Sequence, residues 1–308
     1  MKICSLLPSA TEILYALGLG DQVAGVSHEC DFPSDAKSKP VLIRSRISHT
    51  ESAAAIDRQV REFLERGESL YSVDLEILRE IEPDIIVTQD LCHVCAATPD
   101  DLAAALSYLR NKPLIVTLNP HSLADVCADI QTVGEATASN AQAKRLIAEF
   151  QEEITRVEQS VGGLDRPRVL CLEWLDPPYV AGHWVPEMVE RAGGIDVLGQ
   201  SGKPSFRVEW EKVIESQPEV IVIMPCGYNL AAAEAEFLSL PLPNGWGDLP
   251  AVREGRVFAV DASGYFSRPG PRLGGGLSAL ASAIHAGKRD DIAESLSERK
   301  LVRVASVE

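Results

Sequence analysis

The fold of this 308-residue chain is decided by the stretch Asp74–Val87, DLEILREIEPDIIV. Its apolar residues recur at helical spacing up to the proline at position 83, which ends the helix, and a β-branched run follows. A continuous apolar run of this kind is typical of a parallel strand that is covered on both faces. The stretch Glu209–Val222, EWEKVIESQPEVIV, repeats the pattern around a second proline. The two copies predict two α/β units.

A second pair of segments supports this interpretation. The segment Glu12–Asp21, EILYALGLGD, matches the segment Glu187–Asp196, EMVERAGGID. Both predict a helix that ends at a glycine, where a left-handed backbone is needed. Each helix follows an expected strand, and the expected strands are Lys2–Leu6, Gln22–Val26, Pro113–Thr117, Arg168–Leu172 and Arg256–Val260. A duplicated α/β lobe is the simplest account, with chance similarity of common βα units as the alternative.

The fold class that follows is α/β, with two Rossmann-like lobes whose parallel sheets are joined by a long helix. Apolar residues recur at helical spacing from Asn140 onward, and glycine is a poor residue for a helix interior, so we expect a break between Gly134 and Ser139. The expected boundaries are 1–137 for the first lobe, 138–162 for the linking helix and 163–287 for the second lobe. Residues 288–308 are expected to form a tail of uncertain structure.

Composition excludes several classes of protein. With 45% hydrophobic residues the chain can bury a core, and its 29 basic and 45 acidic residues give a net charge of −16. This balance argues against nucleic-acid binding, which depends on Lys and Arg. No apolar run is long enough for membrane insertion. The amino terminus is expected to be a first strand rather than a leader peptide. The odd number of cysteines, 7, fits the reducing cytosol, so we expect a cytoplasmic location.

Unusual residues follow the expected strands, where open parallel sheets bind ligands. Large planar ligands need flat apolar surface, and five aromatic residues could supply it: Trp174, Trp184, Tyr228, Tyr265 and Phe266. Arg268 and Arg272 could receive carboxylate, phosphate or amide groups. The alternatives are ordinary aromatic packing and arginines that pair with nearby acidic residues.

The same loops contain soft metal ligands: His28, Cys30, Cys92, Cys95, His183 and Cys226. The spacing of Cys92 and Cys95 fits a metal knuckle or a redox pair, although a structural zinc site usually shows a second such pair. The alternative is that these cysteines are small buried residues. The GxSxG, GxxxxGK[ST] and HExxH signatures of common enzymes are absent.

Four motifs resemble a known family. They are SLLPSATE at Ser5–Glu12, GVS leading to DFP at Asp31–Pro33, PDIIV at Pro83–Val87 and FSRPGPR at Phe266–Arg272. Over about residues 1–287 the chain resembles the class III periplasmic binding proteins, in particular cobalamin-binding and iron-siderophore-binding members. The resemblance implies two α/β lobes joined by one long helix, with a ligand held between them.

The resemblance also implies roles for individual residues. Along the ligand cleft it places Pro8, Asp31, Phe32, Trp174, Trp184, Tyr265, Phe266 and Arg268. One acidic residue on each lobe is expected to contact a transporter, and the matching positions are Glu76 and Glu211. The cysteine and histidine motifs depart from the family pattern, so the resemblance is to a cytoplasmic branch.

Two functions are therefore expected. The first is non-catalytic binding of a corrinoid or a related metal chelate, with His28 or His183 near the metal. The alternative is a protein, catalytic or not, that holds a transition metal or an iron–sulfur cluster through the cysteines and histidines, with Glu173 as the acid–base group. The expected partners are the small-molecule chelate and a transporter or corrinoid-handling protein.

Overall fold

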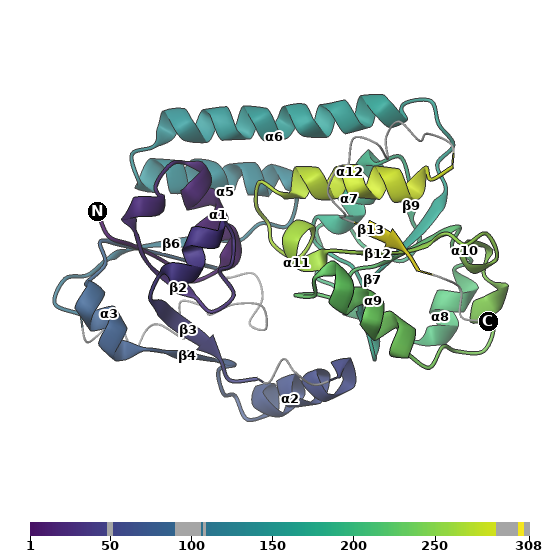
Figure 1. The fold of residues 1–308 in the computed structure, drawn as a ribbon, viewed down its shortest axis with the longest axis horizontal. Helices are drawn as coiled ribbons and strands as arrows, with labels where there is room; N and C mark the ends of the chain where they lie inside the picture. The colour runs from purple at the N-terminus through teal and green to yellow at the C-terminus, as the bar shows by residue number, and fades with distance from the viewer. Residues whose placement is uncertain (48–51, 90–105, 107–108, 288–300, 305–308) are drawn as a thin grey trace. The chain divides into compact units, whose positions relative to one another are not determined.

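The structure, a computed structural model, describes residues 1–47, 52–89, 106, 109–287 and 301–304. It divides into two compact units (Figure 1). The first comprises Met1–Glu51, Ala55–Pro120 and Ala124–Glu149, and the second comprises Ser52–Ala54, His121–Leu123 and Phe150–Glu308. Within the described ranges, no helix combines the length and the apolar character needed to cross a bilayer.

The first unit contains a six-stranded sheet in the order β4-β3-β2-β1-β5-β6. All neighbours are parallel except β3 and β4. The strands are β1 Ile3–Ser5, β2 Val23–Ser27, β3 Val41–Ser45, β4 Tyr71–Val73, β5 Ile85–Gln89 and β6 Leu114–Leu118. The helices are α1 Pro8–Ala16, α2 Ala53–Glu65, α3 Leu75–Ile81 and α5 Leu123–Ala136, with the 3-10 turns η1 Gly20–Gln22 and η2 Ser34–Ser38. Every residue of β5 is buried, as predicted for a strand covered on both faces.

The second unit contains a sheet in the order β10-β8-β7-β11-β12-β13, with β9 beside β7. Its parallel centre is β7 Arg168–Leu175, β11 Val220–Ile223 and β12 Val257–Val260. The other strands are β8 Pro178–Val180, β9 Ile195–Asp196, β10 Phe206–Arg207 and β13 Leu301–Arg303. Helix α6 Asn140–Val161 belongs to the first unit up to Glu149 and to the second from Phe150. The other helices of the second unit are α7 Val185–Arg191, α8 Trp210–Glu215, α9 Leu230–Ser239, α10 Pro250–Arg253, α11 Ala262–Tyr265 and α12 Leu273–Ile284, with the 3-10 turn η3 Trp246–Asp248.

Both sequence repeats correspond to repeated structure. In the first unit β1 is followed by α1, and in the second β7 is followed by the short strand β8 and then α7. Each of the two helices is followed by a left-handed glycine. These glycines, Gly18 and Gly193, have φ of 79° and 80°. The predicted helix–proline–strand units are likewise present as α3 followed by β5 and α8 followed by β11. The prediction of an α/β fold with two parallel-centred sheets is therefore confirmed.

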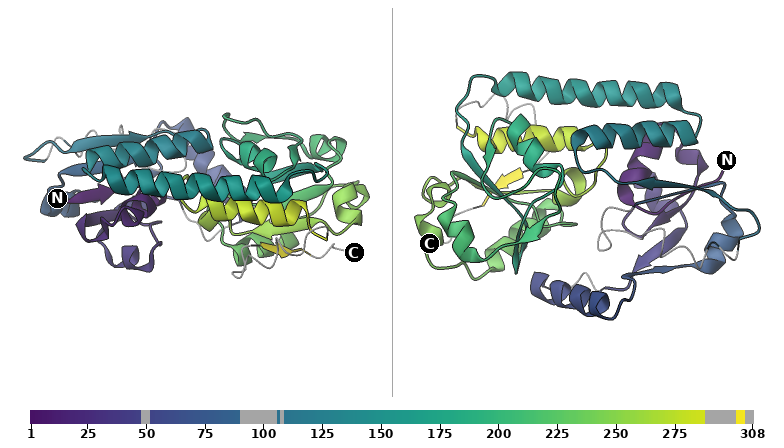
Figure 2. Two further views of the ribbon diagram at one scale, coloured as in Figure 1. Left: turned by 90° about the horizontal axis from the view of Figure 1, so that it is seen from above. Right: turned by 180° about the vertical axis from the view of Figure 1, so that it is seen from behind.

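The expected helix break lies between α5 and α6, which run side by side (Figure 2). Gly134, however, does not cause it, because this glycine lies inside α5. A Cβ on Gly134 would lie 2.5 Å from the Cβ of Ala143 on α6. The glycine therefore permits close approach of the two helices. The described part of the expected tail forms β13, which pairs antiparallel with β12.

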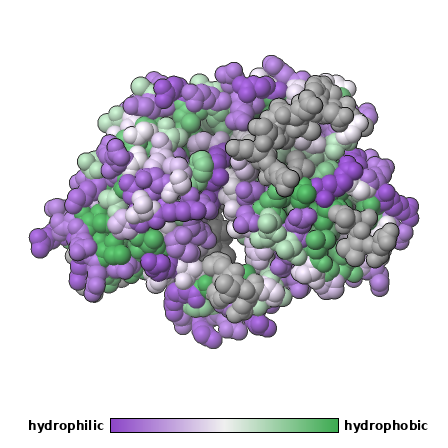
Figure 3. Space-filling model, in the orientation of Figure 1, coloured by the Kyte–Doolittle hydropathy of each residue, from purple (hydrophilic) through white to green (hydrophobic). Residues whose placement is uncertain are grey.

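The surface is mainly polar. Figure 3 shows a predominantly hydrophilic face on which apolar residues form separate patches. The large apolar side chains that are most exposed among the described residues include Leu114, Leu238 and Phe32, at 53%, 50% and 46%.

Candidate functional site

In the first unit, two expected ligand contacts follow the carboxyl end of β2. Asp31 and Phe32 are both exposed, and Phe32 keeps 46% of its surface accessible. A large apolar side chain exposed at the carboxyl edge of a parallel sheet is available to a ligand. Pro8 is the first residue of α1 and is buried, so it shapes the start of the helix.

The neighbouring residues His28 and Cys30 have contacts within the same unit. Cys30 is buried, and its Sγ lies 3.0 Å from Oγ1 of Thr11 and 3.3 Å from Oγ of Ser27. The ring centroid of His28 lies 6.5 Å from that of Tyr71. Cys30 is therefore a buried thiol surrounded by hydroxyl groups.

In the second unit, Trp174 and Tyr228 form an aromatic pair. Their ring centroids are 5.7 Å apart and their planes are inclined at 84°, an edge-to-face arrangement. Trp174 lies near the carboxyl end of β7, and Tyr228 lies in the loop after β11. Both side chains are partly exposed. The structure thus brings together two of the aromatic residues that the sequence offered as ligand contacts.

Backbone hydrogen bonds hold this pair in place. The N–H of Cys226 donates to the carbonyl of Glu173 at 3.0 Å, and the N–H of Ser263 donates to the carbonyl of Tyr228 at 2.9 Å. The loop after β11 is therefore linked both to β7 and to α11, which follows β12. Burial, and secondarily the charge of Glu236, raises the pKa of the Tyr228 hydroxyl. The hydroxyl consequently stays protonated and can donate a hydrogen bond.

His183 adopts an unusual conformation in the same unit. Its φ is 52°, in the left-handed region that non-glycine residues rarely adopt. Its N–H donates to the carbonyl of Lys203 at 2.6 Å. The preceding Gly182 is needed for this contact, since a Cβ there would lie 2.3 Å from the backbone nitrogen of Ser205. Strained backbone of this kind is often found at binding sites.

The His183 ring lies between two other rings. Its centroid is 5.8 Å from that of His121 and 5.5 Å from that of Trp184. Burial, and secondarily the proximity of His121, lowers the pKa of His183. Its buried Nε2 has no hydrogen-bond partner among the described residues. A neutral imidazole with a free nitrogen can ligate a metal. Sequence reasoning missed His121, although this residue follows the end of β6 in the segment Asn119–His121.

Two aromatic residues expected along the ligand cleft are buried instead. Trp184 and Phe266 are 5% and 2% exposed, and the indole N–H of Trp184 donates to the carbonyl of Phe266 at 2.9 Å. They pack internally because the indole nitrogen has a partner there. Tyr265 is partly exposed, with the guanidinium of Arg272 5.6 Å from its ring centroid. Arg268 is also partly exposed.

The alternative metal site receives no support from the described residues. Among them, no three His, Cys, Asp or Glu side chains come together as a metal-binding group. Cys226 is half-buried and not disulfide-bonded. The pair Cys92 and Cys95 lies outside the described residues. The prediction that these side chains bind a metal or a cluster therefore stays a prediction.

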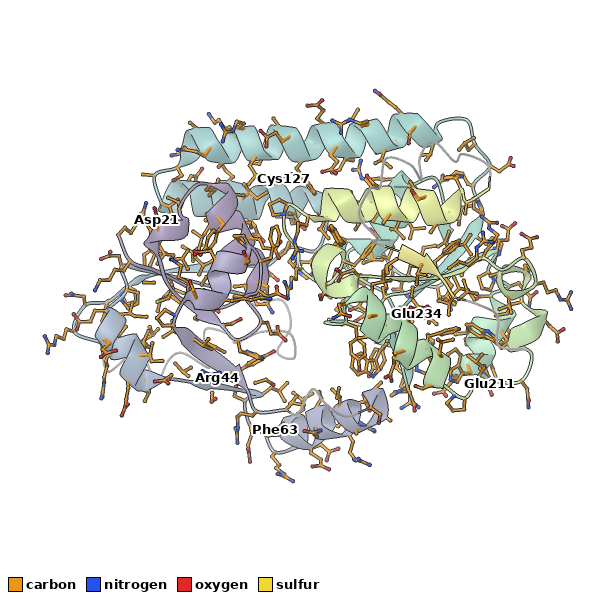
Figure 4. The ribbon with its side chains drawn as sticks, in the orientation of Figure 1. Asp21, Arg44, Phe63, Cys127, Glu211 and Glu234 are labelled. Carbon is orange, nitrogen blue, oxygen red and sulfur yellow. The ribbon has the colours of Figure 1, made fainter. Side chains whose placement is uncertain are left out.

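Glu76 and Glu211 occupy equivalent places in the two units. Each is the second residue of its helix, α3 or α8, and each is exposed (Figure 4 shows Glu211). The Asp74 side chain accepts hydrogen bonds from the N–H groups of Glu76 and Ile77 at the start of α3. A carboxylate is stabilised in the first turn of a helix. Both glutamate side chains are therefore accessible to a partner.

Comparisons with known proteins place this geometry in context. A model of the family described as periplasmic binding protein matches residues 3–263. An uncharacterized ABC transporter substrate-binding lipoprotein of Bacillus subtilis is 24% identical and aligns over 92% of this chain and 80% of its own length. A vitamin B12-binding protein of Vibrio parahaemolyticus is also 24% identical, over 88% and 84%. The structure of a periplasmic heme-binding protein of Roseiflexus sp. RS-1 is 26% identical, with a TM-score of 0.69 over 95% and 98%.

These matches overturn the predicted cytoplasmic location. The similar proteins are periplasmic binding proteins or substrate-binding lipoproteins of ABC transporters, not cytoplasmic proteins. The assignment to a cytoplasmic branch rested partly on an odd number of cysteines, which is an indirect sign of the compartment. The resemblance to the class III periplasmic binding proteins is confirmed.

Proposed function

This chain belongs to the periplasmic binding protein family, and we propose that it binds a corrinoid or a related planar metal chelate for delivery to an ABC importer. Relatives named for the binding of vitamin B12 or heme support this class of ligand. Both ligands are flat macrocycles around a metal. The proposed role is binding without catalysis.

The observation that carries the proposal is the edge-to-face pair of Trp174 and Tyr228. Both rings are partly exposed, and backbone hydrogen bonds between β7 and the loop after β11 hold them, so they offer apolar surface at fixed positions. A macrocycle gains most from such rigid aromatic contacts because little conformational freedom is lost on binding. Phe32 is a separate proposed contact, and 46% of its surface is exposed.

His183 supplies the proposed contact to the metal of the chelate. Its buried Nε2 lacks a hydrogen-bond partner among the described residues, and its lowered pKa keeps the ring neutral at pH 7. Imidazole nitrogen is a suitable axial ligand for iron. Arg268 is proposed to receive acidic or amide groups on the periphery of the ligand.

Glu76 and Glu211 are the proposed contacts to the transporter. Each is an exposed carboxylate at the start of a short helix, one on each unit. Paired carboxylates of this kind complement basic residues on a partner and fix the orientation in which the partner is approached.

Titration tests the proposed function. The purified protein is titrated separately with aquocobalamin and with hemin, and the absorption spectrum is recorded. We expect a saturable shift of the absorption bands with one of the two ligands. Trp174→Ala should bind it more weakly than Trp174→Phe. His183→Ala should lose the part of the spectral change that comes from imidazole binding to the metal. Leu238→Ala on α9 removes another solvent-accessible apolar side chain, 50% exposed, and serves as the control. Absence of a saturable change with both ligands would overturn the proposal.

A further inference from the structure

Helix α1 contacts the loop that carries Phe32 on both sides of that residue. Thr11 and Tyr15 lie one helical turn apart, so their side chains project from the same face of α1. Thr11 contacts the residue before the exposed pair Asp31–Phe32, and Tyr15 contacts a residue after it. The helix thus fixes the two ends of a short segment whose middle is exposed.

The first contact involves Cys30. The Thr11 hydroxyl lies 3.0 Å from the Sγ of Cys30, and both residues are buried. The N–H of Cys30 also donates to the carbonyl of Ser27 at 3.1 Å. The chain is therefore held in place immediately before Asp31.

The second contact is a group of linked hydrogen bonds and an ion pair around η2. The Tyr15 hydroxyl donates to Oδ2 of Asp35 at 2.6 Å. The Lys39 ammonium donates to the carbonyl of Gly20 at 3.0 Å and lies 3.7 Å from the same carboxylate oxygen. The N–H of Ala36 donates to the carbonyl of Pro33 at 2.9 Å, which joins η2 to the exposed segment. Both ends of η2 are thereby attached to the region of α1 and η1.

Gly20 allows the Tyr15 ring to lie where it does. A Cβ on Gly20 would be 2.6 Å from Cε1 and 2.7 Å from Cδ1 of Tyr15. Any larger residue would therefore displace the ring and its hydroxyl. Burial and the Asp35 carboxylate also raise the pKa of Tyr15, so the hydroxyl remains a donor over the physiological range.

We propose that Tyr15 is a positioning residue for Phe32: through Asp35 and η2 it holds this proposed ligand contact of the first unit in place before a chelate binds. This inference rests on the proposed function. An exposed aromatic side chain on an unrestrained loop would lose conformational freedom when a ligand binds, and prior fixation of the loop lowers that loss. Tyr15 itself need not touch the ligand.

The first measurement is the order of Phe32 without ligand. The full chain, which has 7 phenylalanines, is labelled with 4-fluorophenylalanine, and the Phe32 signal in the ¹⁹F spectrum is identified by its loss in Phe32→Leu. In Tyr15→Phe and in Gly20→Ala we expect a narrower Phe32 signal, shifted toward the value of a disordered chain. Asp35→Asn keeps an acceptor for the tyrosine and is expected to retain most of the order.

The second measurement is affinity for whichever of hemin and aquocobalamin binds. Tyr15→Phe is expected to weaken binding by about three- to tenfold, with a nearly unchanged melting temperature. Glu152→Gln, which removes an exposed ion pair with Arg156 on α6, is the control expected to leave affinity unchanged. An unchanged Phe32 signal and unchanged affinity in Tyr15→Phe would overturn the positioning role. Failure of the unsubstituted protein to bind either ligand overturns the proposed function instead.

Discussion

Glu82 and Gln217 adopt the same left-handed backbone conformation, with φ of 45° and 43°, at equivalent points of the two units. Each follows a helix, α3 or α8, and each directly precedes the proline that leads into an interior strand, β5 or β11. The repeated sequence therefore specifies a repeated turn as well as repeated elements. The turn lets a short helix reverse direction within few residues, because a left-handed residue redirects the chain sharply.

Substitution of Gln217 tests the need for this turn. Gln217→Val is expected to lower the free energy of unfolding by about 1–2 kcal/mol, because a β-branched residue is strained at positive φ. Gln217→Gly is expected to stay within about 1 kcal/mol of the unsubstituted protein, since glycine adopts this conformation readily. Chemical denaturation of the two variants measures the difference. Equal stability of the valine and glycine variants would contradict a left-handed turn.

Gly134 provides a second test, in which packing opposes helix propensity. Gly134→Ala would improve intrinsic helix propensity by about 1 kcal/mol. We nevertheless expect a net loss of about 1–3 kcal/mol in the free energy of unfolding, because the new methyl group would lie 2.5 Å from the Cβ of Ala143. The double variant with Ala143→Gly should recover part of the loss. A stabilised Gly134→Ala protein would show that α5 and α6 do not approach so closely.

Because Asp129 is buried, the free energy of unfolding should depend on pH. Asp129 is only 9% exposed. Burial raises the pKa of its carboxyl from 3.8 to about 7, and a hydrogen bond from the Asn119 backbone partly offsets this effect. Between these pH values the folded protein binds more protons than the unfolded chain, so the free energy of unfolding falls as pH rises from about 4 to 7.

The matched variant is Asp129→Asn, which cannot ionise. We expect it to be more stable than the unsubstituted protein at pH 8, by up to about 4 kcal/mol, and to lose this advantage progressively as the pH falls to about 4. Thermal unfolding across this pH range measures the effect. The exposed control Asp248→Asn should show no such crossover. A constant difference between Asp129→Asn and the unsubstituted protein would contradict a raised pKa.

The transporter contacts are tested by charge reversal. Glu76→Lys combined with Glu211→Lys is expected to leave affinity for the chelate unchanged and to reduce import at least tenfold, because opposite charges at the docking surface become like charges. Uptake of the bound ligand by cells that carry the cognate importer is the measurement. Glu80→Lys, on the same helix α3, serves as the exposed control. Normal uptake by the double variant would remove the proposed docking role.

Some features of the site could be predicted because they depend on chain order. The carboxyl ends of parallel strands face the same edge, so Trp174 near the end of β7 and Tyr228 after β11 were expected on one edge of the sheet, and their ring centroids are 5.7 Å apart. The buried state of Trp184 and Phe266 could not be predicted, because aromatic residues suit both a ligand surface and a core. His121 was missed for a related reason: its ring contact with His183 joins segments that are distant in sequence.

The sequence by itself determined the two α/β units, since apolar periodicity, prolines and terminal glycines act locally on the backbone. Tertiary structure decided what individual side chains do. Gly134 looked like a helix breaker but is a point of close helix contact, and Tyr15 looked like an ordinary helix residue but reaches Asp35. These roles depend on distances between segments that meet only in the folded chain, and local sequence patterns carry no record of such distances.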